Sequence, residues 1–153
     1  MRNYSLERVQ FLPISQEDAW AFFSSPGNLE EITPPDMKFE IIDLPAGKMY
    51  AGMLIRYRVR PLWGIPMTWV TRIGEVNAPE KFTDTQLRGP YKRWEHTHIF
   101  ETVAGGVKMT DQVMYSLHLG LLGRVAHALF VKKRLQSIFD FRKQKLIQLL
   151  GTF

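Results

Sequence analysis

Hydrophobic and polar residues alternate through most of the first 117 positions, which is the period of β-strands with one buried face. The clearest case is Met53, Ile55, Tyr57 and Val59, which alternate with arginines at 56, 58 and 60. We take these arginines as a solvated outer face. Prolines and glycines fall between the alternating runs, where turns are needed. The pattern predicts strands at residues 4–12, 39–43, 53–59, 67–73, 81–87, 91–103 and 107–117.

Helical signals interrupt the strands near the start and replace them at the end. Ser15-Gln16-Glu17-Asp18 has the form of a capping box, so a helix is expected from there to Pro26-Gly27. A second short helix is expected over 28–32. After Gly120, apolar residues recur at helical spacing over about 25 to 28 residues, a helix of about 40 Å. Its apolar stripe comprises Leu121, Val125, Ala128, Leu135, Phe139, Leu146 and Leu150.

This order predicts an α+β protein in which an antiparallel sheet of six or seven strands curls around the long C-terminal helix. Residues 1–153 are expected to form a single domain, since no repeat or linker divides them. A sheet wrapped on one helix commonly leaves a cavity between the two layers. We expect a ligand-binding site to lie in that cavity.

Composition narrows the choice of partners and compartment. The sequence has no cysteine and no apolar N-terminal stretch, so we expect a cytoplasmic protein. The net charge is +5, and the region 124–145 carries seven basic residues against one aspartate. Projected at 100° per residue these cations surround the helix axis, which disfavours nucleic acid and leaves only transient membrane-surface contact open. Lys132 interrupts the apolar stripe and is expected to extend outward.

The most informative segment is Tyr91–Phe100, because strand parity places Trp94, His96, His98 and Phe100 on one face. Aromatic rings mixed with imidazoles suit the wall of a cavity better than a dry core or a solvated surface. If Gly105-Gly106 is a two-residue turn, His98 lies opposite Val113 on the next strand. The same parity gives an inward-facing candidate ligand-binding set: Tyr57, Trp69, Phe82, Asp84, Gln86, Trp94, His96, His98, Phe100, Asp111 and Tyr115.

Several roles are open for the histidine pair. The first is structural, with each imidazole bonded to Asp111, Asp84 or backbone, because buried carboxylates without partners are costly. The second is a polar anchor for a ligand carbonyl or hydroxyl. A metal held by His96, His98 and Asp111 is the least favoured, and acid–base chemistry by a His–Asp pair is the fourth. No phosphate-binding glycine loop, Walker sequence or nucleophile elbow occurs.

Particular phrases resemble the START-type helix-grip superfamily, also called SRPBCC, which includes pollen-allergen-like, lipid-transfer and polyketide-cyclase proteins. They are Leu12-Pro13-Ile14, Pro26-Gly27-Asn28-Leu29 through Thr33-Pro34-Pro35, Gly64-Ile65-Pro66-Met67-Thr68-Trp69, Gln86 through Phe100, and Thr110-Asp111-Gln112-Val113. The likeness covers almost the whole chain and is nearest to a bacterial branch described only as ligand-binding. It implies the fold and a cavity, with no metal, cofactor or shared catalytic motif.

We therefore expect a binding protein for an apolar or amphipathic small molecule such as a lipid, quinone or polyketide-like compound, with no cofactor and no assigned catalytic residue. One alternative is a cyclase, dehydratase or hydrolase that uses His96 or His98 as base, with Asp111 or Asp84 fixing the tautomer. Another is an accessory module that binds a membrane or a protein through the basic helix. A contiguous exposed apolar patch beside Lys132 to Arg134 would favour that module.

Overall fold

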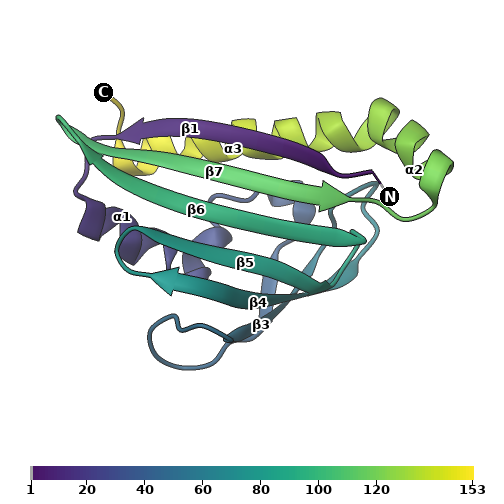
Figure 1. Ribbon diagram of the computed structural model, residues 1–153, viewed down its shortest axis with the longest axis horizontal. Coiled ribbons are helices and arrows are strands. Elements are labelled where there is room, and N and C mark those ends of the chain that lie inside the picture. The colour runs from purple at the N-terminus through teal and green to yellow at the C-terminus, as the bar shows by residue number, and fades with distance from the viewer. Residues whose placement is uncertain (1) are drawn as a thin grey trace.

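The computed structural model describes residues 2–153 as a curved seven-stranded antiparallel sheet and a long C-terminal helix (Figure 1). The strands are ordered β1-β7-β6-β5-β4-β3-β2 in the sheet. Along the chain the elements are β1 (Tyr4–Leu12), α1 (Gln16–Phe23), η1 (Pro26–Leu29), η2 (Pro35–Met37), β2 (Glu40–Asp43), β3 (Leu54–Val59), β4 (Met67–Asn77), β5 (Lys81–Arg88), β6 (Arg93–Val103), β7 (Gly106–Ser116), α2 (Gly120–Ala126), η3 (His127–Val131) and α3 (Lys132–Leu150). The predicted α+β helix-grip architecture is confirmed.

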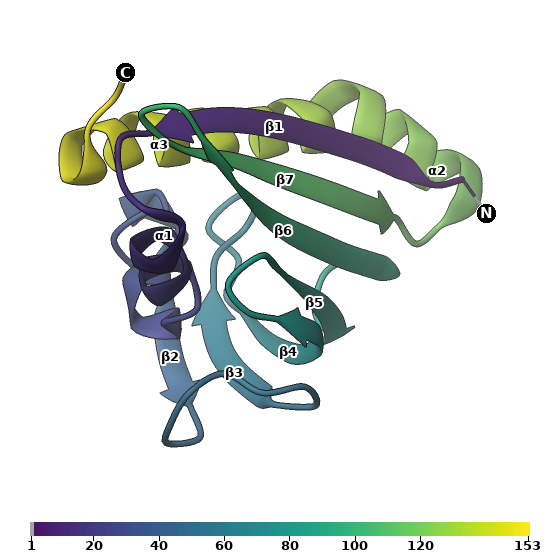
Figure 2. The same ribbon diagram turned by 60° about the vertical axis from the view of Figure 1, so that its left-hand side comes forward.

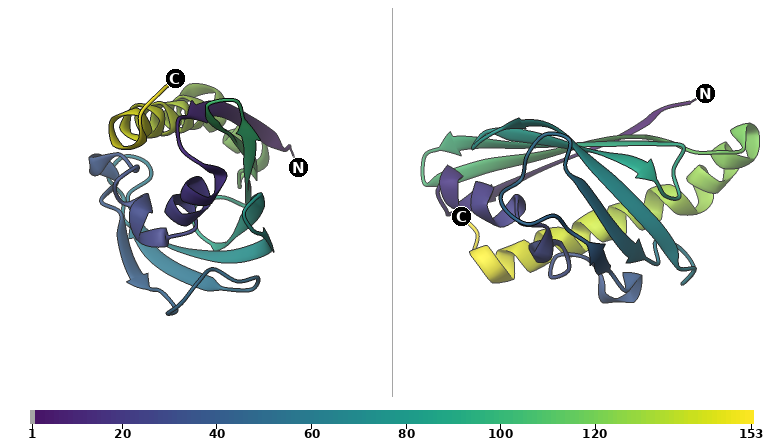
Figure 3. Two further views of the ribbon diagram at one scale, coloured as in Figure 1. Left: turned by 90° about the vertical axis from the view of Figure 1, so that its left-hand side faces the viewer. Right: turned by 90° about the horizontal axis from the view of Figure 1, so that it is seen from below.

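The sheet bends so that its inner face surrounds the helix on several sides, as the view along the molecule shows (Figure 3, left). Alternation along each strand supplies that face with large side chains. One buried cluster includes Leu12, Phe82 and Phe100, and a second includes Trp69, Trp94 and Phe139. A third, smaller cluster comprises Met53, Ile55 and Ile73. The candidate histidines lie on β6, which contributes Phe100 to the first cluster and Trp94 to the second.

The first helix begins as its capping signal predicts. The Ser15 hydroxyl accepts a hydrogen bond from the Asp18 backbone N–H at 3.0 Å. Trp20 then packs edge-on against Phe82 and Phe100. The expected second helix over 28–32 is instead two 3₁₀ turns. The first of them starts at Pro26 because a proline is favoured at the opening position of a helical turn.

The C-terminal helix is longer than expected and contains a π-helical turn at His127–Val131 between α2 and α3. Leu135, Phe139 and Leu146 are buried, as the apolar stripe predicts. The prediction was wrong for Leu121, Val125 and Ala128, which are exposed. Their part of the helix extends beyond the strands at the end where the N-terminus lies (Figures 1 and 2). Within residues 2–153, no helix has the length and apolarity needed to cross a membrane.

The β6–β7 hairpin turns one residue earlier than expected. Val103 pairs with Gly106, so the turn residues are Ala104 and Gly105, and the latter adopts φ +87°. Gly106 starts β7 instead, where an added Cβ would lie 2.1 Å from the carbonyl oxygen of Leu12. His98 therefore pairs with Asp111 and not with Val113. The same shift moves His96 from Tyr115 to Val113 and Phe100 from Asp111 to Met109. Because the shift is even, each residue keeps its predicted face.

Candidate functional site

The site forms where three neighbouring strands bring polar side chains onto the inner face of the sheet. Asp84 of β5 pairs with His96 of β6, and His98 of β6 pairs with Asp111 of β7. Cross-strand neighbours on one face lie close enough for direct contact. His96, His98 and Asp111 are buried to 6%, 4% and 2% exposure, and Asp84 is partly buried. The parity of the strands is therefore sufficient to assemble the cluster.

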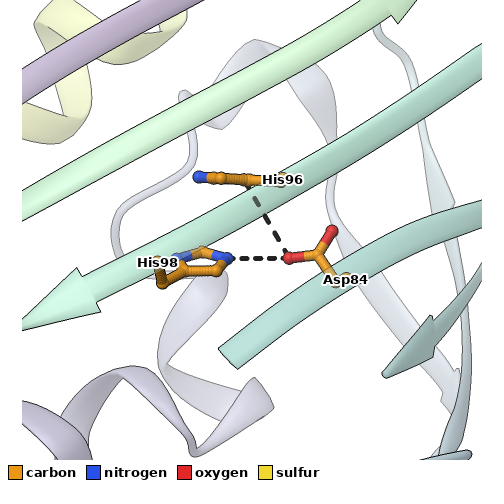
Figure 4. Close-up of side chains that lie close together, drawn as sticks. All are labelled: Asp84, His96 and His98. Atoms are coloured by element: carbon orange, nitrogen blue, oxygen red, sulfur yellow. Dashed lines mark hydrogen bonds and ion pairs between the residues drawn. The ribbon is translucent and has the colours of Figure 1, made fainter. Parts of the chain in front are cut away.

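Each histidine forms its hydrogen bond with the carboxylate diagonal to it. His98 Nε2 lies 2.7 Å from Asp84 Oδ2, and His96 Nε2 lies 2.8 Å from Asp111 Oδ1. The two imidazole rings stack at 3.8 Å between centroids, and the other face of His98 stacks on Phe82 at 4.1 Å. Figure 4 shows both histidines next to the Asp84 carboxylate. These hydrogen bonds and stacking contacts together fix the orientation of both imidazole rings.

The long helix contributes a buried cation, Arg142, that completes the cluster. Its Nη2 donates to Asp111 Oδ1 at 3.1 Å, and its guanidinium lies over the rings of Phe23 and Phe139 at 5.4 and 5.7 Å. Arg142 is only 7% exposed. A buried carboxylate and a buried guanidinium require each other because either alone is strongly penalised. Arg142 therefore ties α3 to the centre of the sheet.

The charges in the cluster determine where its protons reside. Burial alone would raise the pKa values of both aspartates, but Arg142 and the histidines hold that of Asp111 well below its usual range. The pKa of Asp84 is also lowered, chiefly through its hydrogen bond with His98. Burial and the neighbouring His98 lower the pKa of His96. For His98, the contacts with Asp111 and Asp84 outweigh burial, so its pKa is raised. His98 is therefore the ring that takes up a proton first as the pH falls, and His96 is the ring that stays neutral.

The neutral ring has a defined tautomer. His96 Nε2 donates to Asp111, which leaves an unprotonated lone pair on Nδ1. That Nδ1 lies 4.0 Å from Asp84 Oδ2, so two acceptors face each other without a proton between them. Two further polar atoms, His98 Nδ1 and Arg142 Nε, are buried without a hydrogen bond among the residues described, although His98 Nδ1 lies 3.4 Å from Asp111 Oδ1. The cluster therefore has unused hydrogen-bonding capacity.

A metal ion is the other chemistry that these side chains suggest. Donor atoms of Asp84, His96 and His98 lie within 4.8 Å of one another. A bound metal needs the imidazole lone pairs to converge on one point at about 2.0–2.1 Å. The rings are instead stacked only 24° from parallel, so their in-plane lone pairs run side by side. The arrangement suits a hydrogen-bonded network, and we assign no metal to it.

A cavity of about 170 Å³ adjoins the cluster between the sheet and α3. Its walls are mostly apolar, with Ile55, Val59, Trp69 and Phe139 among them. Inside, the Thr71 hydroxyl contacts both the Tyr57 hydroxyl and the Trp69 indole nitrogen at 3.1 Å, so these polar atoms are already paired. A groove of about 240 Å³ shares the lining residues Pro61 and Tyr91 with this cavity and lies outside it. The cavity is thus apolar along its walls and charged at one end.

The structure divides the sequence-predicted site residues into two groups. Those that line the cavity are Tyr57, Trp69, Phe82, Asp84, Trp94, His96 and His98. The others are inward-facing but lie elsewhere. Gln86 bonds the backbone of Tyr91, and Phe100 packs beneath α1. Asp111 accepts a hydrogen bond from His96 and does not line the cavity. The Tyr115 hydroxyl lies 2.7 Å from His127 Nε2. A binding role for any of these residues stays a prediction.

Sequence reasoning missed Arg142, which had been counted only as part of the basic C-terminal segment. Its spacing holds a signal, because it lies seven residues after Leu135 and four before Leu146, within the apolar stripe. A cation inside such a stripe needs a buried anion. Lys132, which also interrupts the predicted apolar stripe, is exposed as expected.

Comparison of this chain with known proteins identifies its fold and does not identify an activity. No family model matches the sequence, and no curated protein matches it either. Among solved structures, protein CV1439 from Chromobacterium violaceum is similar with TM-score 0.72 and 13% identity, covering 97% of this chain and 98% of that one. Major latex-like protein 151 from Panax ginseng matches with TM-score 0.70 and 10% identity, and covers 97% of each chain.

A further solved structure, Ara h 8.0201, is similar with TM-score 0.65 and 16% identity, and the match covers 96% of this chain and 99% of that one. These likenesses span nearly the full length of each protein. At such low identities they show a shared fold and nothing about a ligand. The chain has a helix-grip fold of the type seen in these plant and bacterial proteins.

Proposed function

We propose that this protein binds an apolar or amphipathic small molecule in the cavity between the sheet and α3. The supporting observation is the unequal lining of that cavity: aromatic and aliphatic walls lead to one charged cluster that includes Asp84, His96 and Arg142. Sites of this composition favour ligands with an apolar body and one polar group. At about 170 Å³ the cavity holds a body of about one aromatic ring, so a longer ligand extends into the adjoining groove.

The polar group of the ligand is expected to be a hydrogen-bond donor. His96 Nδ1 and Asp84 Oδ2 are both acceptors and lie 4.0 Å apart, so a hydroxyl or N–H placed beside them can donate a hydrogen bond to one of the two. An anionic head placed next to these two acceptors is repelled by the Asp84 carboxylate. A phenol, alcohol or enol therefore fits this end of the cavity better than a fatty acid.

The first test is mass spectrometry of the native and solvent-extracted protein, followed by titration of alcohols, phenols and fatty acids against tryptophan fluorescence. Trp69 and Trp94 line the cavity, so a bound ligand changes their emission. Ile55→Phe adds volume to the cavity and is expected to weaken binding at least tenfold. Ile42→Phe is the matched control, because Ile42 is 47% exposed on β2. Equal binding by both variants would place the ligand elsewhere.

Selectivity gives an independent check. Asp84→Asn removes one acceptor without changing the size of the side chain, so affinity for a phenol is expected to fall about tenfold, as for one charge-assisted hydrogen bond. Affinity for a fatty acid of similar length is expected to rise. If the wild-type protein prefers the fatty acid, the ligand's polar group is not a hydrogen-bond donor to Asp84 and His96. The proposal that the ligand binds in the cavity would still stand.

A second function, acid–base catalysis, is favoured by the protonation pattern. A neutral imidazole with a lone pair on Nδ1 and a more readily protonated imidazole 3.8 Å away give a base and an acid on one cavity wall. Asp111 fixes the tautomer of the base through His96 Nε2. Such a site removes a proton from an acidic O–H or C–H of a carbonyl compound, as in cyclisation or dehydration.

This function is tested by incubating an isolated ligand, or a panel of β-dicarbonyl compounds, with the protein in deuterated water. Catalysis predicts deuterium at the acidic carbon, seen by mass spectrometry, and its loss in His96→Gln. Ligand affinity in that variant separates a catalytic role from a binding role. Exchange that is unchanged in His96→Gln would exclude this residue as the base.

A further inference from the structure

Large hydrophobic side chains gather at the end of the molecule where the C-terminal helix begins. Leu119 and Leu121 are 76% and 73% exposed, and Trp63, from the β3–β4 loop, is 69% exposed. The ring of Trp63 packs edge-on to Phe130 at 5.3 Å, so the loop and the helix form one continuous surface. We call this the apolar end surface: Trp63, Ile65, Leu119, Leu121, Leu122, Val125, Leu129 and Phe130.

The exposure follows from the geometry of the helix. Gly123, His127 and Val131 recur every four residues and face the sheet; the first two are buried and Val131 is partly buried. Leu121, Val125 and Leu129 recur at the same spacing and must face the other way. His127 is fixed in place by stacking on Tyr4 at 3.5 Å, so the helix cannot rotate to bury its leucines.

The loop side of this surface is built to expose its aromatic residue. Trp63 has φ +53° and precedes Gly64 at φ +68°, a left-handed pair that is uncommon for a bulky residue. The side chain of Arg134 bonds the carbonyl of Pro61 at 2.9 Å and Asp36 at 2.9 Å, which fastens the loop to α3. Indole rings are enriched where an apolar phase meets water.

The charges around the apolar end surface are mostly cationic, and the exposed Asp36 carboxylate beside the loop is paired with Arg134. Arg2, Lys92 and Arg124, from three separate segments, line one hollow together with Leu119 and Leu121. Lys132 and Lys133 follow on the helix and are exposed. The sequence has no acidic residue from 119 to 139 and no charged residue from 61 to 71. An apolar surface with a largely cationic border complements an apolar layer covered by anions.

We propose that the apolar end surface docks onto an anionic lipid membrane, with Trp63 and the helix leucines in the interfacial layer and the Arg2, Lys92 and Arg124 hollow over lipid phosphates. A second copy of this chain is a poorer occupant. A symmetric pair would bring two largely cationic borders together, and their mutual repulsion disfavours it. The proposed docking explains both the exposed leucines and the excess of cations around them.

Docking gives the cavity a route to the membrane. Pro61 and Tyr91 line both the cavity and the outer groove, and Trp63 and Ile65 of the end surface line that groove as well. Exchange of an amphipathic ligand along this route rests on the proposed function. Docking itself does not, since its residues lie outside the cavity.

Docking is tested by co-sedimentation with phosphatidylcholine vesicles that contain or lack phosphatidylglycerol. We expect binding to the anionic vesicles that weakens with added salt. Leu121→Glu with Leu129→Glu is expected to reduce the bound fraction at least tenfold, and Lys132→Gln about fivefold, as for one cation near an anionic surface. Leu149→Glu is the control, because Leu149 is on the same helix, 41% exposed and outside the surface.

Wild-type protein that stays in the supernatant would overturn the proposal, and so would equal sedimentation of the Leu121/Leu129 variant. A dimer in light scattering that this variant abolishes, without vesicle binding, would assign the surface to self-association instead. The cavity variant Ile55→Phe should sediment like wild type. The Leu121/Leu129 variant should still bind small ligands in solution. The two proposals can therefore fail separately.

Discussion

Replacing Arg142 with methionine is expected to destabilise the protein by about 3 kcal/mol at pH 7. The change keeps the aliphatic stem against Phe23 and Phe139 but removes the cation that pairs with Asp111 at 3.1 Å. Asp111 is 2% exposed, so its charge stays buried with only the histidines to compensate it. Removing one member of a buried ion pair costs about 3–5 kcal/mol, and the histidine contacts favour the lower value.

Surface pairs provide the scale for this effect. Arg8 and Asp140 approach more closely, to 2.6 Å, but their side chains are 31% and 66% exposed. Arg8→Met is therefore expected to cost less than about 1 kcal/mol. The comparison separates burial from distance, because the shorter contact should be the weaker one. Chemical denaturation measures both variants, and a change of about 3 kcal/mol corresponds to about 6–12 °C in thermal midpoint for a protein of this size.

The pH dependence identifies the group responsible. In the wild type the folded-state pKa of Asp111 lies below its unfolded value of about 3.9, so its contribution is present above pH 4 and is lost as the pH falls towards the folded pKa. Without Arg142 that lowering is largely removed. The deficit of Arg142→Met should therefore be greatest above about pH 5 and shrink below pH 4. A variant as stable as wild type at pH 7, or a deficit independent of pH, would refute the ion-pair account.

The other predictions concern groups around the cluster. His98→Gln should destabilise the protein most below about pH 6.5, and the loss should fade as the pH rises through the elevated folded pKa, as followed by urea unfolding at several pH values. Gly106→Ala should cost at least about 2 kcal/mol because its Cβ meets the Leu12 carbonyl, whereas Gly27→Ala, with open space around it, should be nearly neutral in thermal melts. Gln86→Ala should lose about 1–2 kcal/mol with its bonds to the β5–β6 turn, yet leave ligand affinity unchanged.

Strand parity is the part of the site that sequence predicts best. A side chain on a strand has only two faces, and a register error of two residues leaves the face unchanged. That is why His98 and Asp111 were assigned to the same inner face although their partners were assigned wrongly. The error arose at Gly105-Gly106, where one glycine makes the turn and the other avoids the Leu12 carbonyl. A contact with a strand a hundred residues away cannot be read from the local sequence.

Which inward-facing residues reach the cavity was not predictable in the same way. Phe82 lines the cavity and Phe100 does not, although both face inward and both pack against Trp20 of α1. Helix spacing likewise gives a stripe without saying which of its turns face the sheet. Leu121 and Leu135 belong to one predicted stripe, but the π-helical turn lies between them and only Leu135 is buried. Such differences depend on how the layers pack, which is a tertiary property.

Stability alone does not account for the polar cluster. Replacing a buried ion network with apolar side chains of similar volume is often neutral or stabilising by about 1–4 kcal/mol. The surroundings here are already apolar, with Phe23, Phe82 and Phe139 packed on Arg142 and His98. Such a network also leaves Arg142 Nε without a hydrogen bond, which adds a cost that an apolar core avoids. The proposed binding of a polar ligand group would account for keeping a costly charged cluster on the wall of a cavity.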